Sequence, residues 1–361
     1  MTFEEARAEF PVLERLAYLN AGSMGPLARA TGEAMAEQVR TDVQAGRAGG
    51  AYFERMLELR GSVRERLAGF LSVAPERMAL TSSTTDGCNI VLSGLELDPE
   101  DEIVTTDAEH PGLLGPLAVS GARVVVAPVA TRPAAEAVDV IRAAITPRTR
   151  LVAISHVVWT TGQVIPVDEV KEATGLPVLV DGAQSVGAIQ VEAGTVDFYT
   201  VSCQKWLCGP DPLGGLYVAD PEGLRLTSPT YFSQQSMEVD GSFVPKDGAL
   251  RFDAGWLAVP SLAGLVAALD LAPEWRFDRA RELAERCRDR LAEAGFEVRT
   301  EPGQAGLVTF EPRNGEPDAA AARALEAGVV IRALPKTPWI RASCGYWTSD
   351  EDVDRLVAAL A

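Results

Sequence analysis

Short apolar runs alternate with stretches of helical periodicity between residues 78 and 218. This alternation predicts a mostly parallel sheet covered by helices on both faces, because a parallel strand is buried on both sides and reads as a continuous apolar run. The predicted strands lie near residues 102–106, 122–127, 150–156 and 177–181, with further short strands starting at Met78, Phe198 and Leu216.

The segments before this region have helical character. Residues 1–16 have the pattern of an amphipathic helix interrupted at Pro11, and a turn follows at residues 20–26. Residues 27–73 alternate apolar and charged positions at helical period, with a glycine-rich break at residues 46–50. Residues 221–250 lack periodicity and are expected to form an extended surface excursion.

The C-terminal part mixes helices and strands in a smaller unit. Ser349 and Asp352 have capping-box spacing at the start of a final helix. The pattern predicts a compact α+β lobe with helices at 277–294 and 317–327 and strands near 296–300, 306–311, 329–333 and 339–343.

Composition and charge narrow the classes of partner. The chain has 361 residues, 47% of them hydrophobic, and a net charge of -18, which repels phosphate backbones and anionic lipid. We therefore expect neither a nucleic-acid nor a membrane partner. No run is apolar enough to span a bilayer, and the acidic N-terminus does not resemble an export signal.

The cysteines and histidines indicate reduced thiols and no metal site. The five cysteines form no C-x-x-C pair, and the two histidines are not spaced as metal ligands. A cytoplasmic location is the simplest interpretation.

A lysine follows one of the predicted buried strands. Phe198, Tyr199 and Val201 form the strand, Lys205 comes just after it, and Gly209 begins the next turn. Burial in a cleft lowers the pKa of an amine and keeps part of it neutral, so that it can form an imine with an aldehyde. The ordinary alternative is an exposed lysine on a solvated loop. Other polar positions at strand ends favour a buried lysine that forms an imine.

Two of these positions carry an acid and an imidazole. An apolar run ends at Asp181, and the carboxyl ends of parallel strands meet in one crevice, so Asp181 is expected to enter the same crevice as Lys205. His110 comes straight after the strand near residues 102–106.

A cluster of hydroxyl side chains stands before a helical stretch at residues 81–85. Free backbone N–H groups and the dipole at the start of that helix would receive a phosphate. Ser83 and Asp86 also have capping-box spacing, so a simple capped helix fits the same residues.

The order of these motifs resembles that of pyridoxal-phosphate enzymes of the class V aminotransferase type. The shared features are a Ser/Thr turn before a helix, Glu-His after a strand, Asp-x-x-Gln and then Ser-x-x-Lys. Cysteine desulfurases, selenocysteine lyases and isopenicillin N epimerase-like proteins belong to this family. The resemblance runs from Tyr18 to Ser343.

This resemblance implies a fold-type-I architecture with pyridoxal 5'-phosphate as cofactor. It implies a large cofactor-binding lobe over residues 17–258, with a mostly parallel sheet of the seven-stranded type. A smaller α+β lobe is expected over residues 259–361, with segment 1–16 packed near it. It also implies a homodimer with active sites at the interface and a small amino acid as substrate.

The resemblance also implies roles for individual side chains. Lys205 would form the imine, Asp181 would pair with the ring nitrogen, Gln184 would bond the phenolic oxygen, and His110 would stack on the ring. The phosphate would be held by Thr84, Thr85, Ser202 and Gln204. Arg341 would bind the substrate carboxylate, and the other expected substrate-binding residues are Arg332, Asn20 and Trp159, with Arg47 as a further candidate for the carboxylate.

The chain departs from the desulfurase pattern at four places. Gln204 stands where histidine is usual, Trp159 where an asparagine is expected, and Trp256 where a threonine of the partner subunit would bind phosphate. The loop at residues 333–339, which would carry the persulfide-forming cysteine, has no thiol.

These features predict an enzyme that acts at the α and β carbons of an amino acid. The leading hypothesis is a carbon–sulfur lyase, desulfurase-like but without the loop cysteine, acting on a cysteine-type substrate. Transamination or epimerisation needs the same first proton abstraction and stays open. A protein that keeps the cofactor pocket without turnover is the third possibility.

Overall fold

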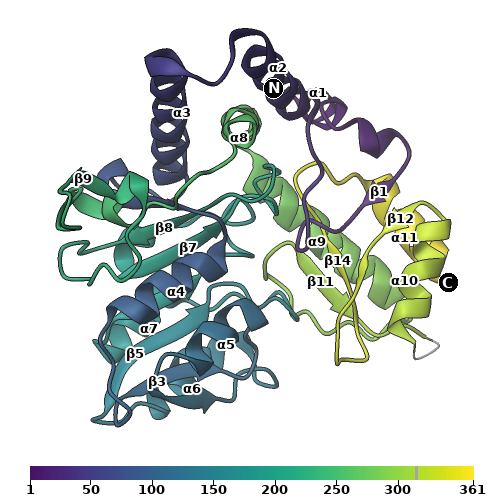
Figure 1. Cartoon of the computed structure of the whole chain (residues 1–361). Coiled ribbons are helices and arrows are strands. Elements are labelled where there is room, and N and C mark those ends of the chain that lie inside the picture. Colours follow the sequence, from purple (N-terminus) through teal and green to yellow (C-terminus); the bar gives the residue numbers. More distant parts are fainter. Residues whose placement is uncertain (314–315) are drawn as a thin grey trace.

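The computed structural model describes residues 1–313 and 316–361. Figure 1 shows a large sheet beside a smaller lobe, with α2, α3 and α8 above them. The large sheet has seven strands in the order β2-β8-β7-β6-β5-β3-β4, of which β3 to β7 run parallel and β8 runs antiparallel to both of its neighbours. Its strands are β2 (Met78–Thr81), β3 (Glu102–Thr106), β4 (Arg123–Ala127), β5 (Thr149–Ser155), β6 (Val178–Asp181), β7 (Phe198–Ser202) and β8 (Gly214–Val218). Each predicted strand of this region is confirmed.

The apolar strands of this sheet supply two cores. In β6, Val178 and Val180 belong to the core on one face and Leu179 to the core on the other. Fully burying one such side chain contributes roughly 1.5–3 kcal/mol. Helices cover both faces: α4 (Thr84–Gly94) and α5 (Pro111–Ala118) on one, and α3 (Gly49–Phe70), α6 (Ala137–Ala143), α7 (Val167–Thr174) and α8 (Val259–Leu271) on the other.

The predicted helical region 27–73 is confirmed with its break. It forms α2 (Arg29–Ala45) and α3, and Gly46 ends α2 with a positive φ of 78°. Residues 221–250 contain a small hairpin of β9 (Gln234–Met237) and β10 (Phe243–Pro245). Helix α8 packs against α2 and α3, and its Leu262 and Leu265 join the core of the large sheet.

The smaller lobe has its own core. Its elements are α9 (Arg276–Glu293), β11 (Leu307–Phe310), α10 (Pro317–Glu326), β12 (Val329–Val330), β13 (Arg332–Ala333), β14 (Ile340–Ser343) and α11 (Asp350–Leu360). Strands β11, β14 and β13 form an antiparallel sheet. The capping box of Ser349 and Asp352 at the start of α11 is confirmed.

The strand predicted near residues 296–300 is wrong. Val298 makes a single bridge to Phe310. The hydroxyl of Thr300 accepts the backbone N–H of Thr309 at 2.9 Å, so a side chain replaces the backbone partner that would extend a ladder.

The N-terminal segment is bound to the small lobe. It forms α1 (Phe3–Ala8), a 3-10 helix (Pro11–Glu14) and β1 (Ala17–Tyr18), which pairs in parallel with β12. Arg7 forms an ion pair with Asp352 of α11 at 2.7 Å. These contacts join the N-terminal segment to the small lobe, and the division of the chain at residues 258/259 stays a prediction. Among the described residues, no helix has both the length and the apolar character needed to cross a bilayer.

Candidate active site

The site lies at the carboxyl ends of β6 and β7, where residues of the small lobe close a cavity of about 250 Å³. Most of the predicted site residues meet there. The cavity is lined by Gly22, Ser23, Ser83, Thr84, Thr85, His110, Trp159, Gln184, Ser202, Gln204, Lys205, Arg332 and Arg341.

Lys205 comes three residues after the end of β7, as the sequence indicates. Burial lowers the pKa of its amine to about 8, and the negative charge of Asp181 opposes part of that shift. Part of the amine is therefore neutral and nucleophilic near neutral pH. This is the state that imine formation requires.

This pKa predicts how capture of the cofactor depends on pH. Because the neutral amine is the reactive form, the rate at which the cofactor-free protein turns yellow with pyridoxal phosphate should rise about tenfold per pH unit below pH 8 and level off above it. Stopped-flow absorbance measures this rate. A rate that still climbs steeply above pH 9 would indicate an amine with its ordinary pKa.

Asp181 ends β6 and is buried beside this lysine. Its Oδ1 accepts the backbone N–H of Ala183 at 2.9 Å. Burial raises the pKa of the carboxyl, and the charge of Lys205 lowers it in turn. A buried carboxylate with so few protein partners is suited to pair with a protonated ring nitrogen.

His110 is the N-cap of α5, and its Nδ1 accepts the backbone N–H of Gly112 at 3.0 Å. Burial, followed by the nearby positive charges of Lys205 and the two arginines, lowers its pKa to about 4. The ring is therefore neutral at pH 7, with its proton on Nε2. It meets the ring of Trp159 edge-on at a centroid distance of 5.2 Å.

The start of α4 forms the wall suited to a phosphate. Ser83 caps the helix by accepting the N–H of Asp86, while the Asp86 carboxylate returns to Ser82 rather than to Ser83. Thr84 and Thr85 begin the helix and line the cavity. Of the two hydrogen bonds of the predicted capping box, only the one accepted by Ser83 is therefore present. The N-terminus of the helix faces the cavity, as the phosphate hypothesis requires.

Two further predicted phosphate ligands, at the end of β7 and just after it, are hydrogen-bonded to each other. The hydroxyl of Ser202 donates to Oε1 of Gln204 at 2.8 Å. This bond leaves the amide nitrogen of Gln204 available to a phosphate as a neutral donor.

Arg341 is completely buried in β14. Its Nη1 donates to the backbone oxygen of Trp159 at 2.5 Å, whereas Nε and Nη2 have no partner among the described residues. Burial and the charge of Arg332 lower its pKa to about 9. A buried guanidinium edge without an acceptor fits a ligand carboxylate.

The structure adds residues that the sequence motifs did not identify. Ser23 lines the cavity, accepts a hydrogen bond from Nη1 of Arg332 at 3.0 Å and donates to Oδ1 of Asn20 at 2.8 Å. Asn20 therefore lies behind Ser23 and not on the cavity wall. Gly22 is required by close approach, because a Cβ there would lie 2.6 Å from Nη2 of Arg341.

Gln184 has partners that its motif does not reveal. Its Nε2 donates to the backbone oxygen of Gly22 at 2.8 Å, and its Oε1 accepts from Nε1 of Trp206 at 2.9 Å. These bonds fix the amide and leave one N–H free for the predicted phenolic oxygen. Nothing in the spacing of the sequence connects Trp206 with Gln184.

No cysteine lines the cavity within the described residues, and all five thiols are buried. Burial raises the pKa of Cys203 and Cys208, the two that flank Lys205. Residues 333–339 form a tight connection between β13 and β14, closed by a hydrogen bond from Leu334 N to Trp339 O at 2.9 Å. The two thiols that flank Lys205 therefore stay protonated, and the described connection at residues 333–339 is not an extended loop.

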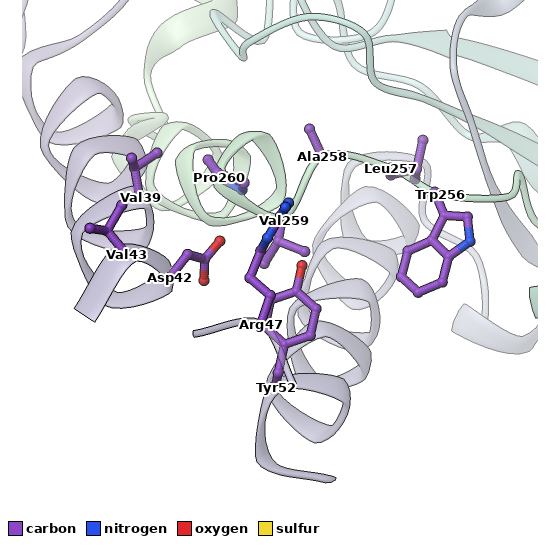
Figure 2. Close-up of a pocket in the computed structure, with 10 residues that line it drawn as sticks. All are labelled: Val39, Asp42, Val43, Arg47, Tyr52, Trp256, Leu257, Ala258, Val259 and Pro260. Atoms are coloured by element: carbon purple, nitrogen blue, oxygen red, sulfur yellow. The ribbon is translucent and has the colours of Figure 1, made fainter. Parts of the chain in front are cut away.

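A larger cavity of about 700 Å³ lies away from this chemistry, along α2, the start of α3 and the segment before α8 (Figure 2). It contains Arg47 and Trp256. Arg47 therefore does not share the cavity of Lys205. Trp256, at 65% exposure, faces outward on this surface.

The residues in and beside the smaller cavity fit pyridoxal phosphate. Lys205 offers an amine with a lowered pKa, Asp181 a buried carboxylate and α4 an N-terminus with hydroxyl groups. Among the described residues, no cluster of His, Cys, Asp and Glu could hold a metal ion.

Comparison with known proteins agrees with this site. The family model for aminotransferase class V matches residues 18–356. Isopenicillin N epimerase of Amycolatopsis lactamdurans is 32% identical over 98% of this chain and 97% of its own length. A probable cysteine desulfurase of Methanothermobacter thermautotrophicus is 27% identical over 99% of this chain and 96% of its own.

Solved structures give the same picture. The cystine C-S lyase C-DES, in complex with its reaction product cysteine persulfide, superimposes with a TM-score of 0.92 at 30% identity, covering 97% of this chain and 98% of its own. A C-DES variant with glycine covalently linked to the PLP cofactor has the same TM-score. The predicted fold-type-I architecture and the cofactor are thus confirmed.

Proposed function

The chain belongs to the class V aminotransferase family of pyridoxal-phosphate-dependent enzymes, and we propose that it is a carbon–sulfur lyase acting on a β-substituted amino acid of the cysteine type. One observation carries the proposal. The cavity combines an amine and a free guanidinium edge, the buried carboxylate of Asp181 lies beside the amine, and the described lining contains no thiol to accept sulfur. The sulfur group would then leave into solution.

Each of these residues has a separate role in the proposed reaction. When bound, pyridoxal phosphate would supply an aldehyde for the substrate amine and a ring able to accept electrons from the α-carbon. Arg341 holds the α-carboxylate, and Nζ of Lys205 removes the α-proton. The carbon–sulfur bond then breaks, the sulfur group leaves with the electron pair, and water converts the remaining enamine into a keto acid and ammonia.

A panel of amino acids tests the proposal. The enzyme should release ammonia and a keto acid in equal amounts from substrates with sulfur at the β-carbon, and it should need no amino acceptor. Turnover that requires a keto-acid acceptor would identify a transaminase instead. Chiral analysis of unreacted substrate would reveal epimerisation.

Epimerisation is the second candidate, supported by the 32% identity to an isopenicillin N epimerase. It requires the proton to return on the opposite face of the α-carbon. His110, with a pKa of about 4, stays neutral and is a poor acid at pH 7. This favours elimination over epimerisation.

Removing the guanidinium of Arg341 should weaken binding of the substrate carboxylate. Loss of one partner of a desolvated charge pair costs roughly 2–5 kcal/mol, so Arg341→Ala should lower kcat/KM more than about tenfold. Arg341→Lys should also have a lower kcat/KM than the wild type, because the single ammonium group of lysine cannot form the two parallel hydrogen bonds of a guanidinium. The yellow colour of both variants checks that the cofactor site is intact, and wild-type kcat/KM in Arg341→Ala would place the carboxylate elsewhere.

We also propose a homodimer. Val43, Tyr231 and Trp256 are 78%, 66% and 65% exposed, and Tyr231 and Trp256 stack on each other. Large apolar side chains gathered on one surface are typical of a protein interface. Sedimentation equilibrium should give the mass of two chains for the wild type and of one chain for Trp256→Asp.

We also propose that the protein is located in the cytoplasm. The five cysteines are unpaired in the structure. Free thiols persist in a reducing compartment. Fractionation of the native cells would test the location.

A further inference from the structure

A buried carboxyl group that the proposed reaction does not use lies just after β3. Glu109 precedes His110 in the chain and is 5% exposed. Its Oε1 accepts the hydroxyl of Thr106 at 2.6 Å, and its Oε2 accepts the N–H and the hydroxyl of Ser155 at 3.0 and 2.5 Å. Thr106 ends β3 and Ser155 ends β5. These bonds therefore tie the loop that carries His110 to the neighbouring strand.

This carboxyl group lies close to a second one. Ser155, which binds Glu109, pairs in register with Asp181 on the adjacent strand β6. Neighbouring strands lie about 5 Å apart, so the two acids share one buried region at the carboxyl end of the sheet. Cys88 of α4 lies near both acids, and burial raises the pKa of its thiol, which stays neutral.

The two acids differ in their access to positive charge. Burial raises the pKa of Asp181, and the charge of Lys205 lowers it in turn. In the described part of the chain, Glu109 has only hydroxyl and backbone partners, and the neighbouring imidazole of His110 is neutral at pH 7. Of the two acids, Asp181 is therefore the one whose negative charge has a cation to stabilise it.

The surroundings of Glu109 favour its neutral form. Burial raises the pKa of its carboxyl to about 7, the hydrogen bonds from Ser155 and Thr106 oppose part of this shift, and the charge of Asp181 adds to it. A second negative charge beside the first is unfavourable where water is excluded. Hydroxyl groups accept as well as donate, so the protonated acid can keep its partners.

We infer that Glu109 is a positioning residue that stays protonated while Asp181 is ionised, so that the pair presents a single negative charge to the cofactor. This inference rests on the ring-nitrogen role proposed for Asp181 and not on the choice of a lyase. Loss of the proton from Glu109 places a second negative charge near the ring. That charge opposes the movement of electrons from the α-carbon into the ring.

The pH dependence of stability tests whether Glu109 keeps its proton. An unfolded chain loses this proton near pH 4.3, so unfolding the wild type between that pH and about 7 releases a proton, and stability falls as the pH rises through this range. In the cofactor-loaded protein, the unfolding temperature of Glu109→Gln minus that of the wild type should rise by about 3 °C or more from pH 5 to 7 and then stay level. A difference that does not vary with pH would show an ionised Glu109 and overturn the inference.

A second pair of proteins tests the coupling between the two acids. Asp181→Asn is compared in the same way with the double variant that also carries Glu109→Gln. Without the charge of Asp181, Glu109 should lose its proton about one pH unit lower, so the difference in unfolding temperature should become level near pH 6. If it still became level near pH 7, Glu109 would titrate independently of Asp181 and the inference would fail.

Glu102→Gln is the matched control. Glu102 starts β3 at the opposite end of the strand and pairs with Arg148 at 2.7 Å. Hydrogen bonds from Thr146 and Arg148 lower the pKa of this carboxyl, which is therefore ionised throughout pH 5 to 8. Its replacement should lower the unfolding temperature by the same amount at every pH in that range.

Kinetics separates a role in the site from a purely structural one. On the best substrate of the panel, the ratio of kcat for the wild type to kcat for Glu109→Gln should be constant below pH 6 and fall about threefold or more by pH 8. A ratio that is the same at every pH would make Glu109 a structural residue and overturn the inference. The stability measurements need no substrate, so failure of the lyase proposal leaves their result valid.

Discussion

Lys205→Ala should yield a colourless protein that turns over substrate about 10³-fold more slowly or worse. The variant loses the covalent attachment of the cofactor and the base that removes the α-proton, and a positioned base alone contributes 10²- to 10⁴-fold. The structure supports both roles, because burial lowers the pKa of this amine to about 8. Absorbance spectra and initial rates measure the two losses.

A matched control is Lys336→Ala, which removes an exposed lysine of the connection between β13 and β14. It should stay yellow and active. If Lys205→Ala, freed of bound amino acids, kept its colour after dialysis, another amine of the protein would hold the cofactor and the assignment of the site would fail.

Asp181→Asn should keep the cofactor but lose about 10²-fold or more in kcat. Asparagine has the same shape and can still accept the N–H of Ala183, so the fold should be retained. It cannot supply the negative charge that keeps the ring nitrogen protonated, and single electrostatic groups of this kind are worth about 10²- to 10³-fold. Steady-state kinetics on the best substrate of the panel measures the loss.

Asp197→Asn is the control for this variant. Asp197 precedes β7 at the opposite end of the strand and pairs with Lys171 at 2.7 Å. Its replacement should affect stability slightly and leave kcat unchanged. Full activity in Asp181→Asn would remove Asp181 from its role.

The central sheet could be predicted from the sequence because its strands are buried on both faces. Such strands appear as apolar runs; Asp181 ends one of them, and Lys205 comes shortly after another. Parallel strands bring their carboxyl ends together, so two residues far apart in the chain could be placed in one crevice.

The contacts of Ser23 and Trp206 could not be predicted in this way. Ser23 meets Arg332, more than three hundred positions along the chain, and Trp206 meets Gln184 through side chains that no periodic pattern encodes. The opposition of Arg332 and Arg341 depends on the register of a hairpin, which the apolar pattern of its strands leaves open.

The strand expected at residues 296–300 shows how a tertiary contact overrides local pattern. Thr300 donates its hydroxyl to the backbone oxygen of Thr161 in the large lobe at 2.7 Å and accepts the N–H of Thr309. The sequence has the alternation of a strand, but this contact between the lobes takes up the hydrogen bond that a ladder would use.

The most direct test determines whether the sulfur of the substrate leaves the enzyme or stays on it. One sample of wild-type enzyme, incubated with a disulfide amino acid such as cystine, is divided for product analysis and for intact-protein mass spectrometry. We expect keto acid and ammonia in equal amounts and an unchanged protein mass, because the five buried thiols and the short connection at residues 333–339 cannot store sulfur. Alanine in place of the keto acid, together with a protein mass increased by the sulfur-bearing group of the substrate bound to a protein thiol, would contradict this expectation.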